Sequence, residues 1–191
     1  RYEARDVDQD LSSKDKVDLW FDNKTLGLTD RAKIQLKQSW TSINKLYSSK
    51  QRLEKIASDI IFDMNLKPRL KNERGTAMLV ANSIYEACRY WDIFTSNGFN
   101  KCAVVTSFEP STASVRTATS DLSQEGEEEY KKSIYERMLK GKKLSEFEKE
   151  VKEQFKKEPA KMKLLIVVDK LLTGFDAPTA TYLYIDKSMR D

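Results

Sequence analysis

The sequence predicts an α/β protein with a parallel sheet, and three observations lead to this class. Two short apolar runs, 76–81 and 101–106, are separated by a segment with helical spacing, which is the strand–helix–strand order of a parallel sheet. A third run, 162–168, is the most apolar of all, and 181–185 is a fourth strand candidate. Continuous apolar runs of this length are typical of strands buried on both faces.

The composition excludes several classes of catalyst and site. The 191 residues include no histidine, which removes Ser-His-Asp and Cys-His catalysis and His-ligated zinc. Cys88 and Cys102 are too few for a four-cysteine site; they could form one disulfide, but both lie in apolar stretches where buried thiols are more common. The net charge of +4 permits a nucleic-acid partner without requiring one. No apolar stretch is long enough to span a membrane and the first residues are charged, so we expect a cytoplasmic protein.

The chain before the first strand predicts a lead-in and a helical hairpin. Residues 1–28 carry dense charge with scattered apolar anchors, which indicates an extended segment. Apolar residues then recur at helical spacing over 32–47 and again over 53–64. We therefore divide the chain into a linker over 1–28, a helical hairpin over 29–74 and the parallel-sheet domain over 75–191.

Helix signals lie between the predicted strands. Ser83 and Glu86 fit a capping box at the start of a helix, and Gly98 lies where a helix commonly ends. The stretch 110–129, rich in Ser, Thr and Glu, predicts a long loop. Two helices with alternating Lys and Glu follow, and Ser145 with Glu148 is a second possible capping box. The mixed charges favour a solvated helical face over a DNA-binding patch.

The most informative segment for chemistry follows the third strand, at residues 167–178. The six glycines of the chain include no pair with Walker A or dinucleotide-fingerprint spacing, so the chain contains no P-loop. This segment nevertheless places one Gly and two Asp at the carboxyl end of a buried strand, where ligands bind in open α/β sheets. Gly174 would let a backbone approach a phosphate closely. The same residue types are also typical of a plain turn, and the chemistry leaves both interpretations open.

The order of residues in this segment is more informative than the residue types alone. The run I-V-V-D-K-L-L-T-G-F-D-A-P at 166–178 resembles motif V of the restriction (R) subunit of type I restriction–modification enzymes, a superfamily 2 helicase-like DNA translocase. Residues 2–9 resemble that subunit's linker into its second motor domain, 52–60 the helix before the first strand of that domain, and 75–90 its motif IV strand and helix. The resemblance covers nearly the whole chain and is least specific over 110–129 and the helices after it.

The resemblance implies a RecA-like three-layer domain, the second of two that close on ATP and pull along one strand of duplex DNA. In the full subunit, ATP and Mg²⁺ are bound with the Walker motifs of the first domain, and an arginine in motif VI of the second completes the site. Motif VI should begin just beyond Asp191, so we expect a truncated domain with no catalytic residue, no metal site and no cofactor bound by the fragment alone. The implied partners are double-stranded DNA, the first motor domain, and the methylation and specificity subunits, with no membrane.

The resemblance also assigns residues within motif V. Asp176 resembles the motif V Asp that faces the ATP ribose, and we group Gly174 with it as ATP-binding. Thr173 resembles a position that contacts nucleic-acid phosphate, and we assign it to DNA.

Two further strand ends resemble DNA-backbone contacts. Asn82 and Ser83 resemble motif IV positions that could bind a phosphate at the helix N-terminus, although a plain N-cap explains Ser83 equally well. Thr106 and Ser107 resemble another backbone-contacting loop. The alternative function is a DNA- or protein-binding module on a RecA-like scaffold without ATPase activity, or a different superfamily 2 helicase.

Overall fold

The computed structural model describes residues 3–5, 29, 50–110 and 122–187, with the side chains of 122–125 left out. The chain divides into two compact units, 1–56 and 57–191, and the second contains the whole sheet. A helix over residues 50–66 contains the predicted apolar stripe. The first half of the predicted hairpin and most of the predicted linker lie outside the described residues, so both stay predictions.

A four-stranded sheet forms the centre of the second unit, and all its neighbouring strands are parallel. The strands are β1 (Thr76–Ala81), β2 (Cys102–Val104), β3 (Leu164–Val167) and β4 (Ala180–Asp186). Their order in the sheet is β2-β3-β1-β4, and every residue of β1, β2 and β3 is buried. The predicted α/β class and all four predicted strands are therefore confirmed, with the second and third strands shorter than their apolar runs.

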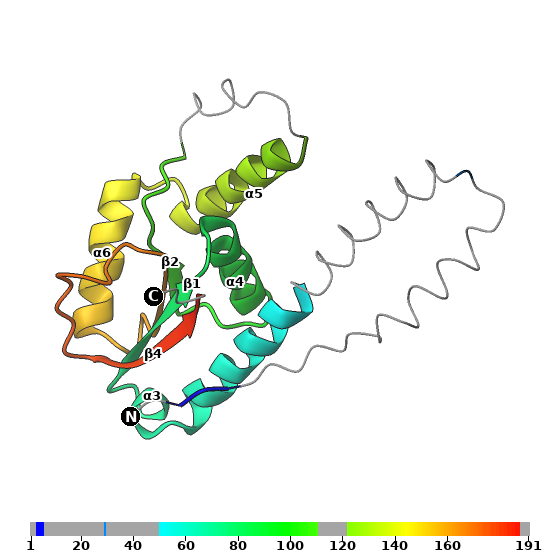
Figure 1. The fold of residues 1–191 in the computed structure, drawn as a ribbon. Coiled ribbons are helices and arrows are strands. Elements are labelled where there is room, and N and C mark those ends of the chain that lie inside the picture. Colours follow the sequence, from blue (N-terminus) through cyan, green and yellow to red (C-terminus); the bar gives the residue numbers. More distant parts are fainter. Residues whose placement is uncertain (1–2, 6–28, 30–49, 111–121, 188–191) are drawn as a thin grey trace. The chain divides into compact units, whose positions relative to one another are not determined.

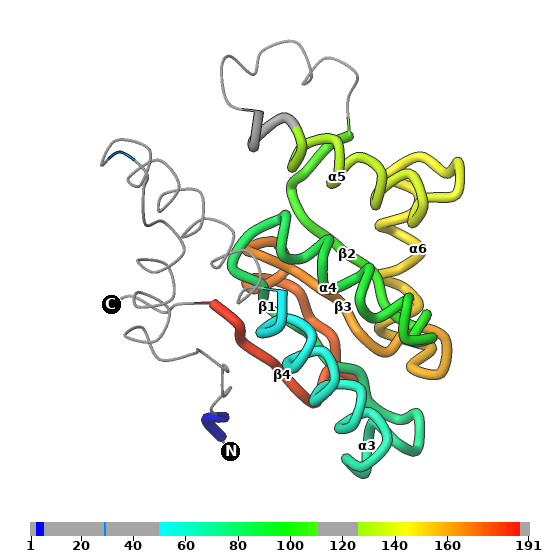
Figure 2. Tube along the Cα trace, turned by 90° about the vertical axis from the view of Figure 1, so that its right-hand side faces the viewer, coloured from blue at the N-terminus to red at the C-terminus, as the bar shows by residue number. Residues whose placement is uncertain are grey.

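Helices cover both faces of this sheet, as in a RecA-like domain (Figures 1 and 2). They are α3 (Pro68–Lys71), α4 (Ile84–Ser96), α5 (Leu122–Leu139) and α6 (Leu144–Lys157). On one face lie α4 and residues 57–66 of the preceding helix, in which Asp63 accepts a 3.0 Å hydrogen bond from Tyr184 of β4. On the other face lies α6, and α5 packs against α4 beside β2.

Two local predictions between the second and third strands are wrong. The predicted loop over 110–129 is helical from Leu122 onward, because Glu and Gln are good helix formers and acidic side chains favour the first turns. Residues 111–121 of that loop lie outside the described part of the chain. The second capping box is absent, because α6 begins after Lys143, which has no side-chain cap, and Ser145 lies inside the helix.

The two cysteines are buried free thiols, as their apolar surroundings predict. Burial raises the pKa of Cys88 and of Cys102 to about 12, so neither thiol ionises near neutral pH. Across the residues that the structure describes, no helix is long and apolar enough to cross a membrane.

Candidate functional site

The exits of the parallel strands gather at one edge of the sheet. Val80 pairs with Val167, and Val104 with Ile166, so β1, β2 and β3 end at the same level. The segments that follow these strands begin at Asn82, Val105 and Val168. The predicted contact segments therefore begin side by side at the carboxyl edge, the usual position of ligand sites in open α/β sheets.

One lysine joins two of these segments to α6. The Nζ atom of Lys170 donates to the carbonyl oxygen of Thr106 at 3.1 Å and to the carboxylate of Glu148 at 2.7 and 2.9 Å. Glu148 is 8 % exposed and also accepts a hydrogen bond from Lys152 at 2.9 Å. Burial raises the pKa of Glu148, but the hydrogen bonds from Lys170 and Lys152 outweigh it, so the pKa is lowered overall. Glu148 is thus a buried carboxylate held in its charged form.

Two further interactions connect β4 to the same edge. Lys187 forms a 2.6 Å ion pair with Asp169, whose side chain is 78 % exposed. Because β1 lies between β3 and β4, this pair spans the end of β1. Tyr90 of α4 donates a 2.6 Å hydrogen bond to Asp186 at the end of β4. An exposed pair such as Lys187–Asp169 contributes little stability, so the Tyr90 bond is the firmer of the two.

The loop that follows β3 leaves this edge after its first residues. The ring of Phe175 lies 6.1 Å from that of Phe155, near the end of α6, and 4.6 Å from Nζ of Lys156. Thr179 then donates to the carbonyl oxygen of Phe155 at 2.8 Å and accepts from the amide of Thr76 at 2.7 Å, where β1 begins. The expectation that the Gly and both Asp of residues 167–178 lie at the carboxyl end of the strand is therefore wrong for the second half of this segment. A strand parallel to β3 must start at the opposite edge, so the connection has to cross.

The motif V residues lie in the crossing part of this loop. Thr173, Gly174 and Asp176 are all exposed. Gly174 has φ +71°, and a Cβ added there would meet no atom within 4 Å. The backbone conformation at position 174 therefore requires glycine, and the space beside this residue is open. The assignments of these residues to ATP and DNA stay predictions.

The motif IV residues lie at the start of α4. Ser83 is its N-cap, and its hydroxyl accepts a 3.1 Å hydrogen bond from the amide of Glu86. The plain N-cap interpretation is therefore realised, since this hydroxyl oxygen already accepts a bond from the helix. Asn82 beside it is exposed.

The segment after β2 presents one of its two predicted residues to solvent. Thr106 is 2 % exposed, its hydroxyl lies 2.7 Å from that of Tyr135, and it accepts the amide of Phe108 at 3.2 Å. The Thr106 side chain is thus engaged inside the domain. Ser107 is exposed and is the residue of this pair that faces outward.

The sequence interpretation missed the ion pair between Glu148 and Lys170, and it assigned Glu148 to a possible capping box instead. Glu148 lies between Phe147 and Val151 on the inner side of α6, where a carboxylate needs a buried partner. A carboxylate at this apolar position was the sequence feature that could have indicated a buried ion pair. The partner could not be found from spacing, because Lys170 is 22 residues away in sequence.

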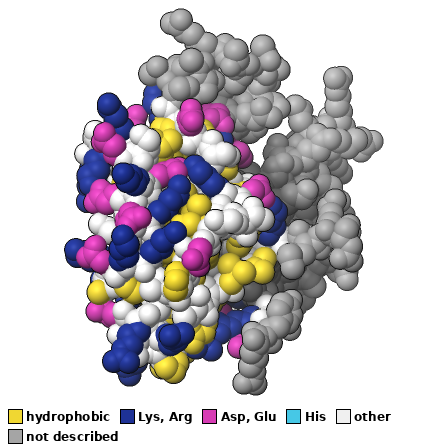
Figure 3. Space-filling view, turned by 90° about the vertical axis from the view of Figure 1, so that its left-hand side faces the viewer, with side chains coloured by type: hydrophobic (Ala, Val, Ile, Leu, Met, Phe, Trp, Pro, Cys, Tyr) yellow, Lys and Arg dark blue, Asp and Glu magenta, His cyan; other side chains and the backbone are white. Residues whose placement is uncertain are grey.

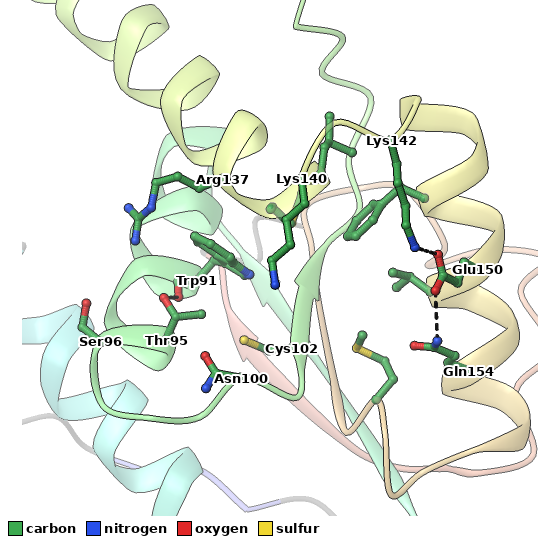
Figure 4. Close-up of a pocket in the computed structure, with 15 residues that line it drawn as sticks. Trp91, Thr95, Ser96, Asn100, Cys102, Arg137, Lys140, Lys142, Glu150 and Gln154 are labelled. Carbon is green, nitrogen blue, oxygen red and sulfur yellow. Dashed lines mark hydrogen bonds and ion pairs between the residues drawn. The ribbon is translucent and has the colours of Figure 1, made fainter.

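A cavity of about 680 Å³ lies away from this edge, beside β2 (Figure 4). Its walls come from the ends of α4 and α5 and from α6, and Met138 closes it against β2 by accepting the Val104 amide at 3.3 Å. Trp91, Lys140 and Gln154 line it, and it includes none of the predicted site residues.

Charged side chains of both signs interleave over the outer face of the α6 side (Figure 3). Lys142 pairs with Glu150, and Lys157 with Glu153. This mixture agrees with the predicted solvated face. The structure, over its described ranges, also holds no group of three or more His, Cys, Asp or Glu able to bind a metal ion.

Comparison with known proteins decides the family. Residues 73–191 match the family model of type I restriction enzyme subunit R domain 3, which is more than half of the chain. The chain belongs to this family. It is also 27 % identical over 192 residues to the "Putative type I restriction enzyme MjaIXP endonuclease subunit" of Methanocaldococcus jannaschii. That alignment covers all of this chain and 16 % of the relative, so the chain spans only a small part of the length of that relative.

Proposed function

We propose that this R-subunit domain is the second RecA-like domain of an ATP-dependent DNA-translocating motor. The observation that carries the proposal is the loop containing D-K-L-L-T-G-F-D-A-P, which leaves β3 beside the exits of β1 and β2. Besides the carboxylates of Asp169 and Asp176, this loop exposes Thr173 and Gly174. The neighbouring strand exits expose Asn82 and Ser107, so the edge offers hydroxyl, amide and backbone donors. Such donors suit sequence-independent contact with a phosphate backbone.

In this proposal, DNA phosphates contact Asn82, Ser107 and Thr173, with backbone amides contributing near Ser83 and Thr106. The hydroxyl of Ser83 and the side chain of Thr106 have their own partners inside the domain, so these two positions would act through the main chain. This distribution assigns side-chain contacts to the exposed positions alone.

The motif V loop fits one side of a bound nucleotide. Gly174 has open space beside it and Asp176 is exposed, so the loop presents a backbone and a carboxylate to a ligand arriving from outside. Asp176 would accept hydrogen bonds from the ribose, and the backbone at Gly174 would lie near phosphate. ATP with Mg²⁺ would supply the free energy for closing the two motor domains. The Walker residues that hold the phosphates and the metal would come from the first domain.

The proposed setting is the cytoplasmic restriction complex, with the methylation and specificity subunits and duplex DNA as partners. The test uses the full-length R subunit assembled in that complex. We expect Thr173→Ala and Asp176→Ala each to remove DNA-stimulated ATPase activity and translocation, with the thermal unfolding midpoint unchanged. Asp59→Ala, an exposed carboxylate on the helix over 50–66, is the matched control and should behave as wild type.

Wild-type ATPase and translocation in both loop variants would refute the site assignment. A wild-type complex that binds DNA but does not hydrolyse ATP would instead support a binding module on a RecA-like scaffold.

A further inference from the structure

The outward-facing residues of the motif V loop lie between two anchor residues, whose side chains contact the rest of the domain. No side-chain hydrogen bond or ring contact holds residues 171–174 within the described part of the chain. The anchor before them is Lys170 and the anchor after them is Phe175. Both anchors rest on α6, the first on Glu148 near its start and the second on Phe155 near its end. The position of Thr173 and Gly174 is therefore set by α6.

The first anchor also reaches a second proposed DNA contact. Lys170 donates to the carbonyl oxygen of Thr106, and Ser107 is the next residue. One ammonium group thus fixes the motif V loop, α6 and the exit of β2 relative to one another. The Nζ atom has three protons, and its three oxygen partners lie at 2.7–3.1 Å.

Glu148, the partner of Lys170 on α6, has few other hydrogen-bond donors. Glu148 is 8 % exposed, and a carboxylate at that burial needs hydrogen bonds to remain charged. Without Lys170 it keeps only Lys152, which lies on its own helix. By contrast, the Lys142–Glu150 pair is exposed and joins α6 only to the turn before it. The two pairs share residue types and differ in what they connect.

We propose that the Lys170–Glu148 ion pair is a positioning device that sets the spacing between the motif V loop and the Ser107 segment. This inference rests on the proposed motor function, in which both segments contact DNA phosphates. A loop that keeps its residues but loses this spacing would still bind ATP and DNA, and would couple them poorly.

The experiment measures coupling in the full-length R subunit assembled in its complex. The variants are Glu148→Gln, which keeps shape and removes charge, Lys170→Met, and Lys170→Arg as the conservative rescue. Glu150→Gln is the matched control on the same helix. For each, the readouts are the kcat and KM of DNA-stimulated ATP hydrolysis, the base pairs translocated per ATP, and the thermal unfolding midpoint.

We expect Glu148→Gln and Lys170→Met each to lower the base pairs moved per ATP about fivefold or more, with a smaller change in the KM for ATP. Because both act through one pair, the double variant should lose no more than either single one. Lys170→Arg keeps a donor fork for the carboxylate and should restore most of the coupling. Glu150→Gln should match wild type.

Unchanged coupling in Glu148→Gln and Lys170→Met would overturn the inference, and so would a lower unfolding midpoint as the sole effect. If Thr173→Ala is inactive in the same assays while these variants couple normally, the proposed function stands and the inference fails. If Thr173→Ala is also fully active, the proposed function itself fails. Should Lys170→Met not fold, Glu148→Gln and Lys170→Arg still decide between these outcomes.

Discussion

Replacing Gly75 with alanine should destabilise the domain through a steric conflict at the start of β1. Gly75 is buried, and an added Cβ would lie 2.5 Å from Oγ1 of Thr181, 3.0 Å from Cβ of Arg69 and 3.3 Å from the carbonyl oxygen of Arg69. Ordinary van der Waals contact begins at 3.4 Å. That carbonyl already accepts the amides of Arg74 and Gly75, at 3.1 and 2.8 Å, so it cannot move away freely.

The expected cost is about 2 kcal/mol in the free energy of unfolding, because overpacking typically costs about 1–3 kcal/mol. The Thr181 hydroxyl would have to rotate or shift, and it would then lose its 3.4 Å hydrogen bond to the carbonyl oxygen of Thr76. That bond is long, so we expect its loss to add only a few tenths of a kcal/mol. Movement of β4 itself is opposed by its pairing with β1 on this side.

Urea unfolding of the chain, followed by circular dichroism, measures this cost. Gly126→Ala is the matched control, since Gly126 lies in α5 with no atom within 4 Å of an added Cβ. It should be neutral or stabilise by up to about 1 kcal/mol. Thr181→Ala removes the closest atom and should recover part of the loss in the Gly75→Ala background. A cost for Gly75→Ala below about 0.5 kcal/mol, or no recovery in the double variant, would refute the steric reasoning.

Three further predictions follow from the same structure. Cys88 and Cys102, with pKa values near 12, should resist a thiol reagent at about pH 8 in the folded chain and react after urea unfolding, as thiol titration can show. Ser83→Ala should lower the free energy of unfolding by about 1 kcal/mol, and Ser83→Asp, which keeps a cap, should not. The pKa of Glu148 is lowered from 4.5, so its charge stabilises the fold above that pH; the difference in urea stability between wild type and Glu148→Gln should shrink as the pH falls below 4.5.

Three of the four strands could be located from the sequence because their burial is complete, while β4 is only partly buried. The run 76–81 lies between Gly75 and Asn82, and the strand found there has the same bounds. The order of the strands could not be found in this way. The three buried strands are similarly apolar, and the strand order depends on which crossovers pack well, which is settled by contacts between distant segments.

The candidate site was only partly predictable for the same reason. The motif V wording located Thr173, Gly174 and Asp176 in the loop after β3, and the parallel sheet brought the start of that loop beside Asn82 and Ser107. The later course of the loop follows from the position of β4, which local sequence does not specify. The engagement of the Thr106 hydroxyl with Tyr135 is equally non-local, since the two residues are 29 positions apart.

Several lysines among the described residues pair with carboxylates, which bears on how the domain would hold DNA. Lys142, Lys157 and Lys170 each pair with a glutamate of α6. Asn82 and Ser107, the exposed positions at the exits of β1 and β2, are uncharged. The exposed Asp169 at the exit of β3 pairs with Lys187. Contacts made by neutral donors displace few counterions, so the share of DNA binding contributed by this domain should depend only weakly on salt. A net charge of +4 therefore says little about DNA affinity here, and weak, salt-tolerant binding would suit the proposed motor function, in which the domain releases and rebinds the backbone at each step.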